Sequence, residues 1–231
     1  MAKFLTEMHF HTAETSNCGK LPANESVKRY IKLGYKTIVV TDHLSTHTYF
    51  KYDYDNLTWD NKINIFLKGY KAAAAAANGK INILLGMELR FDDNSDPNDY
   101  LVYGVSEKFL RNNKDLLNMN IKSFSQLAHK NGLLIFQAHP FRFGMKVTNP
   151  KHLDGVEIYN GNPRHNSNNE VAKLWAEKYK LMAVAGSDHH EDGDEGNAGI
   201  LFKNKIVSND ALLKELNSKN YTIYKQTPDF K

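Results

Sequence analysis

Histidine and carboxylate side chains occur as pairs two residues apart at two distant places in the chain. His9 and His11 form one pair, and Asp188 and His190 form the other. Because side chains alternate between the two faces of a strand, each pair would place both members on one face, and His189 would point the other way. Imidazole and carboxylate ligands together suit zinc, manganese or iron, whereas calcium and magnesium prefer oxygen ligands alone. The two pairs therefore predict a transition-metal site.

Other polar side chains follow or lie along short apolar runs elsewhere in the sequence. They are Asp42 and His43 after TIVVT, Glu88 after ILLGM, His139 after LLIFQA, and Glu157 and Asn160 along GVEIYN. In a parallel barrel the carboxyl ends of all strands open onto one face, where active sites lie. Residues far apart in the sequence would therefore converge there. A closed structural zinc site is not expected, because the chain has a single cysteine.

Strand-like apolar runs alternate with helical segments along the chain. The expected strands are FLTEMHFH, KTIVVTDH, INILLGMEL, DYLVYGV, LLIFQAHP, DGVEIYNG, LMAVAGSD, AGILF and YTIY. One helix is expected over Ala23–Leu33, with Asn24 as its N-cap and Gly34 as its stop, and an alanine-rich helix should end at Asn78-Gly79. Further helices are expected in SFSQLAHKNG, NEVAKLWAEKYK and NDALLKELNS.

This alternation predicts a mostly parallel sheet, with runs such as TIVV and LLIF covered on both faces. About seven such units favour an α/β barrel over an open sheet. The length of 231 residues, without a linker or composition break, predicts one domain over residues 1–231.

The composition is that of a soluble protein, with 41% hydrophobic and 24% charged residues. The net charge of +4 suits an anionic ligand, but no dense basic stripe indicates a nucleic-acid surface. The first residues lack the apolar segment of a signal peptide, and no apolar run reaches the length of a membrane span. A cytoplasmic protein is therefore expected, with its oligomeric state open.

The motifs HFHT, TDH, GMEL, AHPFR and GSDHH, in this order, resemble those of the PHP (polymerase and histidinol phosphatase) superfamily. The resemblance runs from His9 to about His190, which is most of the chain. It implies a distorted (β/α)7 TIM-like barrel that holds two or three divalent ions of zinc, manganese or iron at its C-terminal mouth. The resemblance assigns ligands to each ion as follows: His9, His11, Glu88 and Asp188 to the first, Glu88 and His139 to the second, and His43 and His190 to the third.

Two segments depart from the family pattern. Members of the family often carry Asp or His shortly after the first motif, where this chain reads AETSNCG and offers Glu14, Asn17 or Cys18. Many also have a histidine before the apolar run that follows the bridging glutamate. Here the segment reads NDYLVYG, in which Asp99 could substitute as an oxygen ligand. The ligands that complete the metal sites thus stay open.

Two further residues are candidates for supporting roles. Asp42 would orient a neighbouring group if His43 is a ligand. Arg142, three residues beyond His139, is a candidate for gripping an anionic substrate with two nitrogens at once, although an ordinary surface arginine is the alternative.

The function expected from this set is metal-dependent hydrolysis of small phosphate esters, by a histidinol-phosphatase-like monoesterase or a small phosphodiesterase. Two ions bridged by Glu88, with Asp188 as a ligand, would turn a shared water into the attacking hydroxide. Arg142 would stabilise charge on the phosphoryl oxygens, and His190 or His43 would protonate the leaving alkoxide. The alternatives are hydrolysis of a C–N or C–O bond in the amidohydrolase manner, and a non-catalytic metal- or phosphate-binding module.

Overall fold

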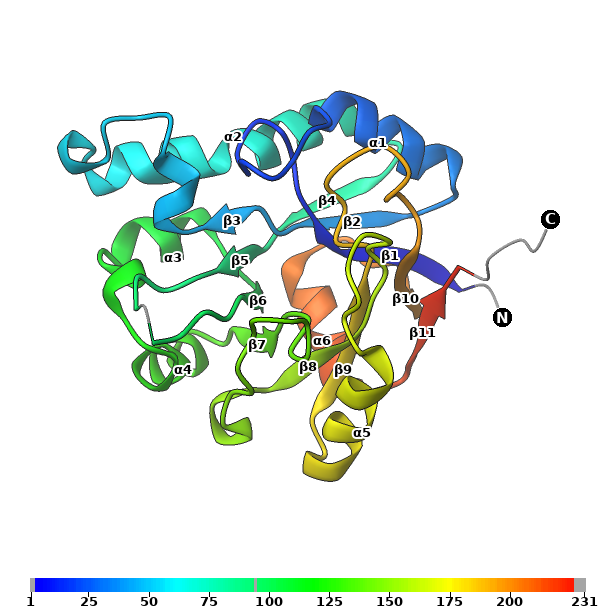
Figure 1. The fold of residues 1–231 in the computed structure, drawn as a ribbon. Coiled ribbons are helices and arrows are strands. Elements are labelled where there is room, and N and C mark those ends of the chain that lie inside the picture. The colour runs from blue at the N-terminus through cyan, green and yellow to red at the C-terminus, as the bar shows by residue number, and fades with distance from the viewer. Residues whose placement is uncertain (1–2, 94, 227–231) are drawn as a thin grey trace.

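The computed structural model describes residues 3–93 and 95–226. These residues form two sheets with helices packed against them (Figure 1). The first sheet has the order β11 (Tyr221–Lys225), β10 (Ala198–Phe202), β1 (Phe4–Phe10), β2 (Thr37–Val40) and β4 (Asn82–Leu85). The second has the order β3 (His43–Leu44), β5 (Met87–Leu89), β6 (Tyr100–Tyr103), β7 (Leu134–Gln137), β8 (Gly155–Asn160) and β9 (Met182–Gly186). The predicted α/β class is confirmed.

The strand pairing is mixed, so the expectation of a mostly parallel sheet holds only in part. β2 pairs in parallel with β1 and β4, β3 with β5, and β8 with β7 and β9. In contrast, β6 runs antiparallel to β5 and β7, and β10 runs antiparallel to β1 and β11. The chain passes from β5 to β6 without a helix, which an antiparallel neighbour allows and a parallel neighbour does not. A closed ring of seven βα units is not confirmed.

The two sheets meet where the strands after α1 and α2 are interrupted. Thr41 and Asp42 separate β2 from β3, and Gly86 separates β4 from β5. Backbone bonding continues through the interruption, because Gly86 N donates to Val40 O at 2.9 Å and Glu88 N donates to Asp42 O at 3.1 Å. At the other side of the sheets, a parallel bridge joins Phe10 at the end of β1 to His189 beyond β9.

Six α-helices lie in the described part of the chain: α1 (Ala23–Lys32), α2 (Trp59–Ala77), α3 (Glu107–Asn112), α4 (Ile121–Lys130), α5 (Asn169–Tyr179) and α6 (Asn209–Ser218). In Figure 1, α1 and α2 lie side by side above β1, β2 and β4, and α5 lies beside β8 and β9. The alanine-rich helix ends as predicted, with Asn78 at φ 42° and Gly79 at φ 72°. The short helix α3 was not anticipated from the sequence.

The start of α1 differs from the prediction in its capping residue. Asn24 lies inside the helix, and Pro22 precedes the first helical residue. Gly34 stops the helix as expected, with φ 84° just beyond its end. Since α1 has no side-chain cap from Pro22, its first amide groups need an acceptor from elsewhere in the chain.

One apolar cluster joins the two sheets beneath the polar strand ends. It contains Met8 of β1, Tyr103 of β6, Phe136 of β7, Val184 of β9 and Ile200 of β10, all at most slightly exposed. Strands of both sheets therefore share one interior, which holds their ends in fixed relative positions. Of the helices in residues 3–93 and 95–226, none combines the length and apolar character that crossing a bilayer requires.

Candidate metal centre

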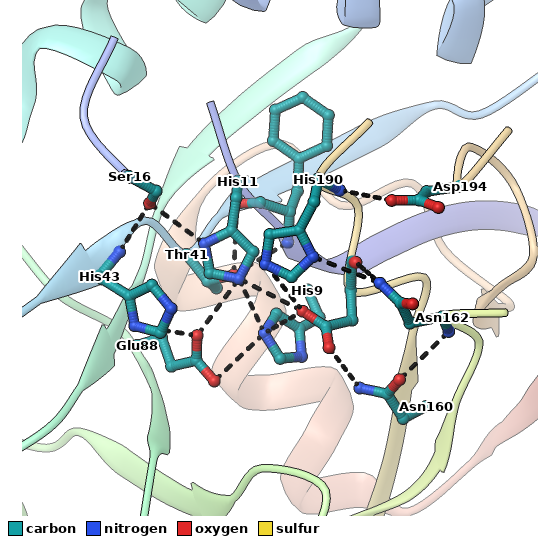
Figure 2. Close-up of polar contacts among 12 residues, drawn as sticks. His9, His11, Ser16, Thr41, His43, Glu88, Asn160, Asn162, His190 and Asp194 are labelled. Atoms are coloured by element: carbon teal, nitrogen blue, oxygen red, sulfur yellow. Dashed lines mark hydrogen bonds and ion pairs between the residues drawn. The ribbon is translucent and has the colours of Figure 1, made fainter. Parts of the chain in front are cut away.

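Polar side chains from both sheets converge at one rim (Figure 2). Their potential donor atoms form four overlapping groups, within each of which all donors lie within 4.8 Å of one another. The groups are His9, His11 and Asp188; His9, Glu88 and His139; His43, Glu88 and Asp99; and His11, Cys18, His43 and His190. Residues separated by most of the sequence are thus brought together at this rim.

Glu88 stands between the imidazole rings with its two oxygens facing different pairs of histidines. Its Oε1 lies 3.3 Å from Nε2 of both His9 and His139. Its Oε2 lies 3.2 Å from His11 Nε2 and 3.2 Å from His43 Nδ1. Glu88 is 1% exposed, and its Oε1 has no hydrogen-bond partner among residues 3–93 and 95–226. This is the position that a carboxylate shared between two cations would occupy.

Asp188 closes the group on the side of β1. Its Oδ1 lies 3.2 Å from His9 Nε2, 3.4 Å from His11 Nε2 and 3.6 Å from His190 Nε2. His189 points away, as the alternation predicts. Its ring stacks on Phe10 and its Nε2 lies 3.0 Å from Ser26 Oγ in α1.

The backbone is left-handed at two of these positions. His139 has φ 28° and Asp188 has φ 50°. For residues other than glycine, this conformation is strained by about 1–3 kcal/mol and persists where the surroundings hold it, often at functional sites. Both residues lie two positions beyond the end of a strand, where the backbone turns, and His139 Nε2 lies 3.3 Å from Glu88 Oε1.

Glu157 of β8 orients the inner histidines. Its Oε1 lies 2.9 Å from His9 Nδ1, so the opposite ring nitrogen of His9 faces Glu88 and Asp188. Its Oε2 accepts hydrogen bonds from His139 N and from Asn160 Nδ2, each at 3.0 Å. The sequence marked Glu157 and Asn160 only as polar residues of a strand. The signal for their role was a carboxylate within an apolar run, which is costly unless the charge is paired.

Asp42 holds the segment that follows His11. It accepts hydrogen bonds from Thr12 N and Thr12 Oγ1 at 2.7 Å and from Ser16 Oγ at 2.6 Å. Because Ser16 Oγ donates to Asp42, it can accept from His11 Nδ1, which lies 3.2 Å away. Asp42 thus fixes its neighbours, in the orienting role expected from the sequence, and leaves His11 Nε2 free for a ligand.

The protonation of the inner groups reflects their mutual charges. Burial disfavours the charged form of His9, but the carboxylates of Asp188 and Glu88 raise its pKa well above the usual range. Despite burial, the same two carboxylates raise the pKa of His11 to about 9. Burial alone would raise the pKa of the two carboxyl groups. At Glu88 the charges of His43 and His9 outweigh burial, and the pKa lies well below normal. At Asp188 the charges of His9 and His190 have the same effect. Without an ion, protons on His9 and His11 therefore balance the two carboxylates.

The outer histidines behave differently. Burial lowers the pKa of His43 to about 4 and that of His190 to about 3. Both rings are thus neutral at pH 7 and are able to act as ligands through a lone pair.

The segment after the first motif places Glu14 away from the other predicted ligands. The carboxylate of Glu14 accepts hydrogen bonds from Ala23 N at 3.0 and 3.1 Å, outside the donor groups. The start of α1, which has no side-chain cap from Pro22, needs this acceptor, and Glu14 supplies it. Asn17 likewise donates to the His47 carbonyl. Cys18 is the residue of AETSNCG that joins a donor group, with His11, His43 and His190.

Asp99 lies at the centre as predicted, but its carboxylate is shared. Both oxygens accept hydrogen bonds from the Arg90 guanidinium at 2.6 Å, and Oδ2 lies 3.9 Å from His139 Nε2. Asp99 precedes β6, and because β6 is antiparallel to its neighbours its first residues reach the same rim as the ends of β5 and β7. Asp99 can therefore complete the group only together with its arginine.

A cavity of about 770 Å³ opens above the centre. Glu88, His139, Asp188 and His190 line its base, and basic side chains surround it. Arg90 and Arg164 are engaged in close ion pairs with Asp99 and Asp194. Arg142 is different, because its nearest carboxylate oxygens, on Asp99 and Asp188, are each 3.7 Å away. Its guanidinium thus lies over the centre without a close ion pair among the described residues.

The donor set fits divalent transition-metal ions. Imidazole nitrogens and carboxylate oxygens of this kind are ligands of zinc, manganese and iron. The buried Oε1 of Glu88 and Nδ1 of His139 have no hydrogen-bond partner in the part of the chain that the structure describes. A buried polar atom without a partner is costly in a finished site, and a cation beside Glu88 would satisfy its oxygen.

Comparison with known proteins gives a family and a set of similar folds. The chain matches the PHP domain family over residues 7–227. No curated protein matches it. Solved structures that are similar in fold include the following three.

The first is a two-domain protein from Bacteroides vulgatus that contains a predicted PHP-like metal-dependent phosphoesterase. It has a TM-score of 0.69 and 16% identity, over 97% of this chain and 65% of that protein. This chain therefore spans about two thirds of the length of that relative.

The second is PsfC from Pseudomonas syringae, with a TM-score of 0.69 and 13% identity over 98% of this chain and 93% of that protein. The third is an amidohydrolase from Chromobacterium violaceum, solved with sulfate and no metal. It has a TM-score of 0.57 and 15% identity over 98% of this chain and 99% of that protein.

Proposed function

The chain belongs to the PHP domain family, and from this premise we propose that it is a hydrolase that cleaves phosphate esters with bound divalent metal ions. The observation that carries the proposal is the position of Glu88, whose two oxygens each face two histidines at the base of an open cavity. A shared carboxylate of this kind is the arrangement from which a two-metal hydrolytic site is built.

The inner residues divide between two ions. We assign His9, His11, Asp188 and Glu88 to one, and Glu88 with His139 to the other. When bound, the ions lower the pKa of a water molecule and offset negative charge on the phosphoryl oxygens. Glu157 bonds to Nδ1 of His9 and so keeps Nε2 of that ring directed at the ion position. Asn160 Nδ2 donates to Oδ2 of Asp188 and so leaves Oδ1 of that carboxylate directed at the same position.

Arg142 is assigned to the substrate phosphate. Its guanidinium lines the cavity, is 20% exposed and lies over Asp99 and Asp188 without a close ion pair. It can therefore turn toward a phosphate and hold two of its oxygens at once. The neighbouring Arg90 and Arg164 keep the cavity attractive to anions while remaining fixed by their own carboxylates.

His190 and His43 are assigned to ligation rather than to proton transfer. Burial lowers the pKa values of both rings to about 3 and about 4, so neither carries an extra proton at pH 7. A general acid works best with a pKa near the operating pH. The expected role of either ring as the acid for the leaving group is therefore not part of the proposal.

The proposed substrate is a small phosphorylated molecule. The cavity of about 770 Å³ lies within the range of small-molecule sites, roughly 300–1,000 Å³. A phosphomonoester of the histidinol phosphate type and a small phosphodiester both satisfy this description. An assay with both classes of phosphate ester distinguishes the two.

The amidohydrolase alternative is less favoured. Enzymes of that type commonly bridge their metals with a carboxylated lysine, whereas Glu88 has the bridging position here.

The test is turnover of a panel of phosphomonoesters, phosphodiesters, amides and lactones by protein loaded with manganese or zinc. Hydrolysis of phosphate esters is expected, and Glu88→Gln should reduce it by more than about a hundredfold because the shared ligand is lost. His129→Ala is the matched control, since His129 lies 3.0 Å from Asp154 outside the donor groups. Turnover confined to lactones or amides would overturn the proposal, and binding of metal and phosphate without any turnover would indicate a binding module.

A further inference from the structure

We propose that Cys18 is a metal ligand and that Cys18, His43 and His190, with His11 beside them, form a thiolate–imidazole site selective for Zn²⁺. We call this group the Cys18 site. The inference deepens the proposed function, on which it rests for the presence of divalent ions, and it assigns the ligand that the segment AETSNCG left open.

The donor atoms of the Cys18 site are close together. Those of Cys18, His11, His43 and His190 all lie within 4.8 Å of one another. The ring of His11 stacks between the other two, with centroids 4.7 Å from His43 and 4.5 Å from His190 (Figure 2). His43 and His190 border the cavity, and Cys18 is exposed to the same cavity. An ion from solvent can therefore reach all three.

The loop that carries Cys18 is fixed to both outer histidines. Ser16 Oγ accepts a hydrogen bond from His43 N at 3.0 Å, and Lys20 N donates to His190 O at 2.7 Å. Cys18 lies two residues from each of these anchors. Within the loop, Gly19 N donates to Ser16 O at 3.0 Å. The loop that carries the thiol is thus bonded to the backbone of both outer histidines.

Gly19 is required for this placement. A Cβ at Gly19 would lie 2.6 Å from the carbonyl oxygen of Thr12, so the loop packs directly onto the segment that follows His11. Thr12 is in turn held by Asp42. The position of Cys18 is therefore determined by the same contacts that orient the metal centre.

The chemistry of its ligands determines which metal ion the Cys18 site prefers. Thiolate sulfur with imidazole nitrogen favours zinc, whereas oxygen-rich sites also accept manganese. On binding, Zn²⁺ replaces the thiol proton, which passes to solvent. The Glu88 centre, with nitrogen and oxygen donors alone, has no such preference, so the two parts of the rim differ in metal selectivity.

The first experiment is the absorption spectrum of the Co²⁺-loaded protein. Thiolate coordination to Co²⁺ gives a charge-transfer band in the near ultraviolet, and because the chain has one cysteine, only Cys18 can produce it. The band is expected in the natural protein and in Asn17→Ala, the control in the same loop, and it should be lost in Cys18→Ser. Its absence from the folded natural protein would overturn the proposal.

The second experiment counts zinc after dialysis. The natural protein should retain one equivalent more than Cys18→Ser, while Cys18→Asp should retain the ion but lose the preference for zinc over manganese. Alkylation of the thiol should also be suppressed by added Zn²⁺. An unchanged zinc count in Cys18→Ser would contradict the assignment.

The experiments can disprove the proposed function and the Cys18 site independently of each other. A charge-transfer band in a protein that hydrolyses no phosphate ester would support the Cys18 site and remove the proposed function. Phosphoesterase activity without the band would support the function and remove the Cys18 site.

Discussion

Single residues at the rim are expected to exchange protons for metal ions. In the metal-free protein His11 is protonated at neutral pH, because Asp188 and Glu88 raise its pKa to about 9. An ion that binds at Nε2 must displace this proton. His43 and His190 are already neutral, with pKa values of about 4 and about 3, and release none.

Metal affinity of the inner site should therefore rise with pH, by about tenfold per unit for each displaced proton, until the pH passes 9. Calorimetric titration in two buffers of different ionisation enthalpy, at pH 7.5, should show proton release at the Glu88 centre. The stability of the metal-free fold has the opposite pH dependence. The contribution of His11 to the metal-free fold is complete below its ordinary pKa of 6.5 and is lost as the pH rises through about 9. A binding enthalpy independent of the buffer would contradict this account.

Arg142 provides a second test at the same scale. Arg142→Lys keeps the charge but not the two-nitrogen grip, so it should raise KM for a phosphate ester by about tenfold, and Arg142→Ala by more. The variants should bind metal normally, because the guanidinium is no closer than 3.7 Å to the carboxylates of Asp99 and Asp188. Unchanged kinetics in both variants would show that Arg142 does not hold the substrate.

At the scale of elements, the start of α1 depends on a residue far from its own first turn. Glu14 accepts hydrogen bonds from Ala23 N, which Pro22 cannot cap with its side chain. Glu14→Ala should lower the free energy of unfolding by about 1 kcal/mol, as loss of a helix cap does. Urea denaturation measures this change. Metal content should remain that of the natural protein, and a loss of bound ion would restore Glu14 as a candidate ligand.

Strand periodicity made the pairing of distant side chains predictable from sequence. Local alternation is enough to place His9 and His11 on one face and to turn His189 away. The same reasoning did not anticipate Asp188 with a positive φ, because a backbone turn leaves no mark on the spacing of side chains. It also gave no role to Glu157, whose partners His9 and His139 come from other strands.

Strand direction could not be predicted in the same way. An apolar run such as YLVY has the same pattern in either direction, so the antiparallel β6 was missed. Its direction brings Arg90 and Asp99 together across the β5–β6 connection. For the same reason, the sequence could propose Asp99 as a ligand but could not show that an arginine already binds it.

At the scale of the molecule, the candidate metal centre joins both sheets. His9 lies in β1 of the first sheet and Glu88 in β5 of the second, while His139 and Asp188 follow β7 and β9 of the second sheet. Ions that bind only the folded chain should stabilise it by about 2.7 kcal/mol when the free ion is at a hundred times Kd. Urea unfolding with and without a chelator measures the difference. In Glu88→Gln the chelator should change the stability much less. If the natural protein had the same urea midpoint with and without the chelator, a metal centre that links the sheets would be excluded.

The order of the donors along the polypeptide also affects how the protein is made. His9 and His11 leave the ribosome long before Asp188 and His190. Domains fold as they are synthesised, from the amino end onward. A nascent chain therefore carries unpaired histidines and a glutamate until the later donors emerge, and the donor groups that include Asp188 or His190 can form only after that point.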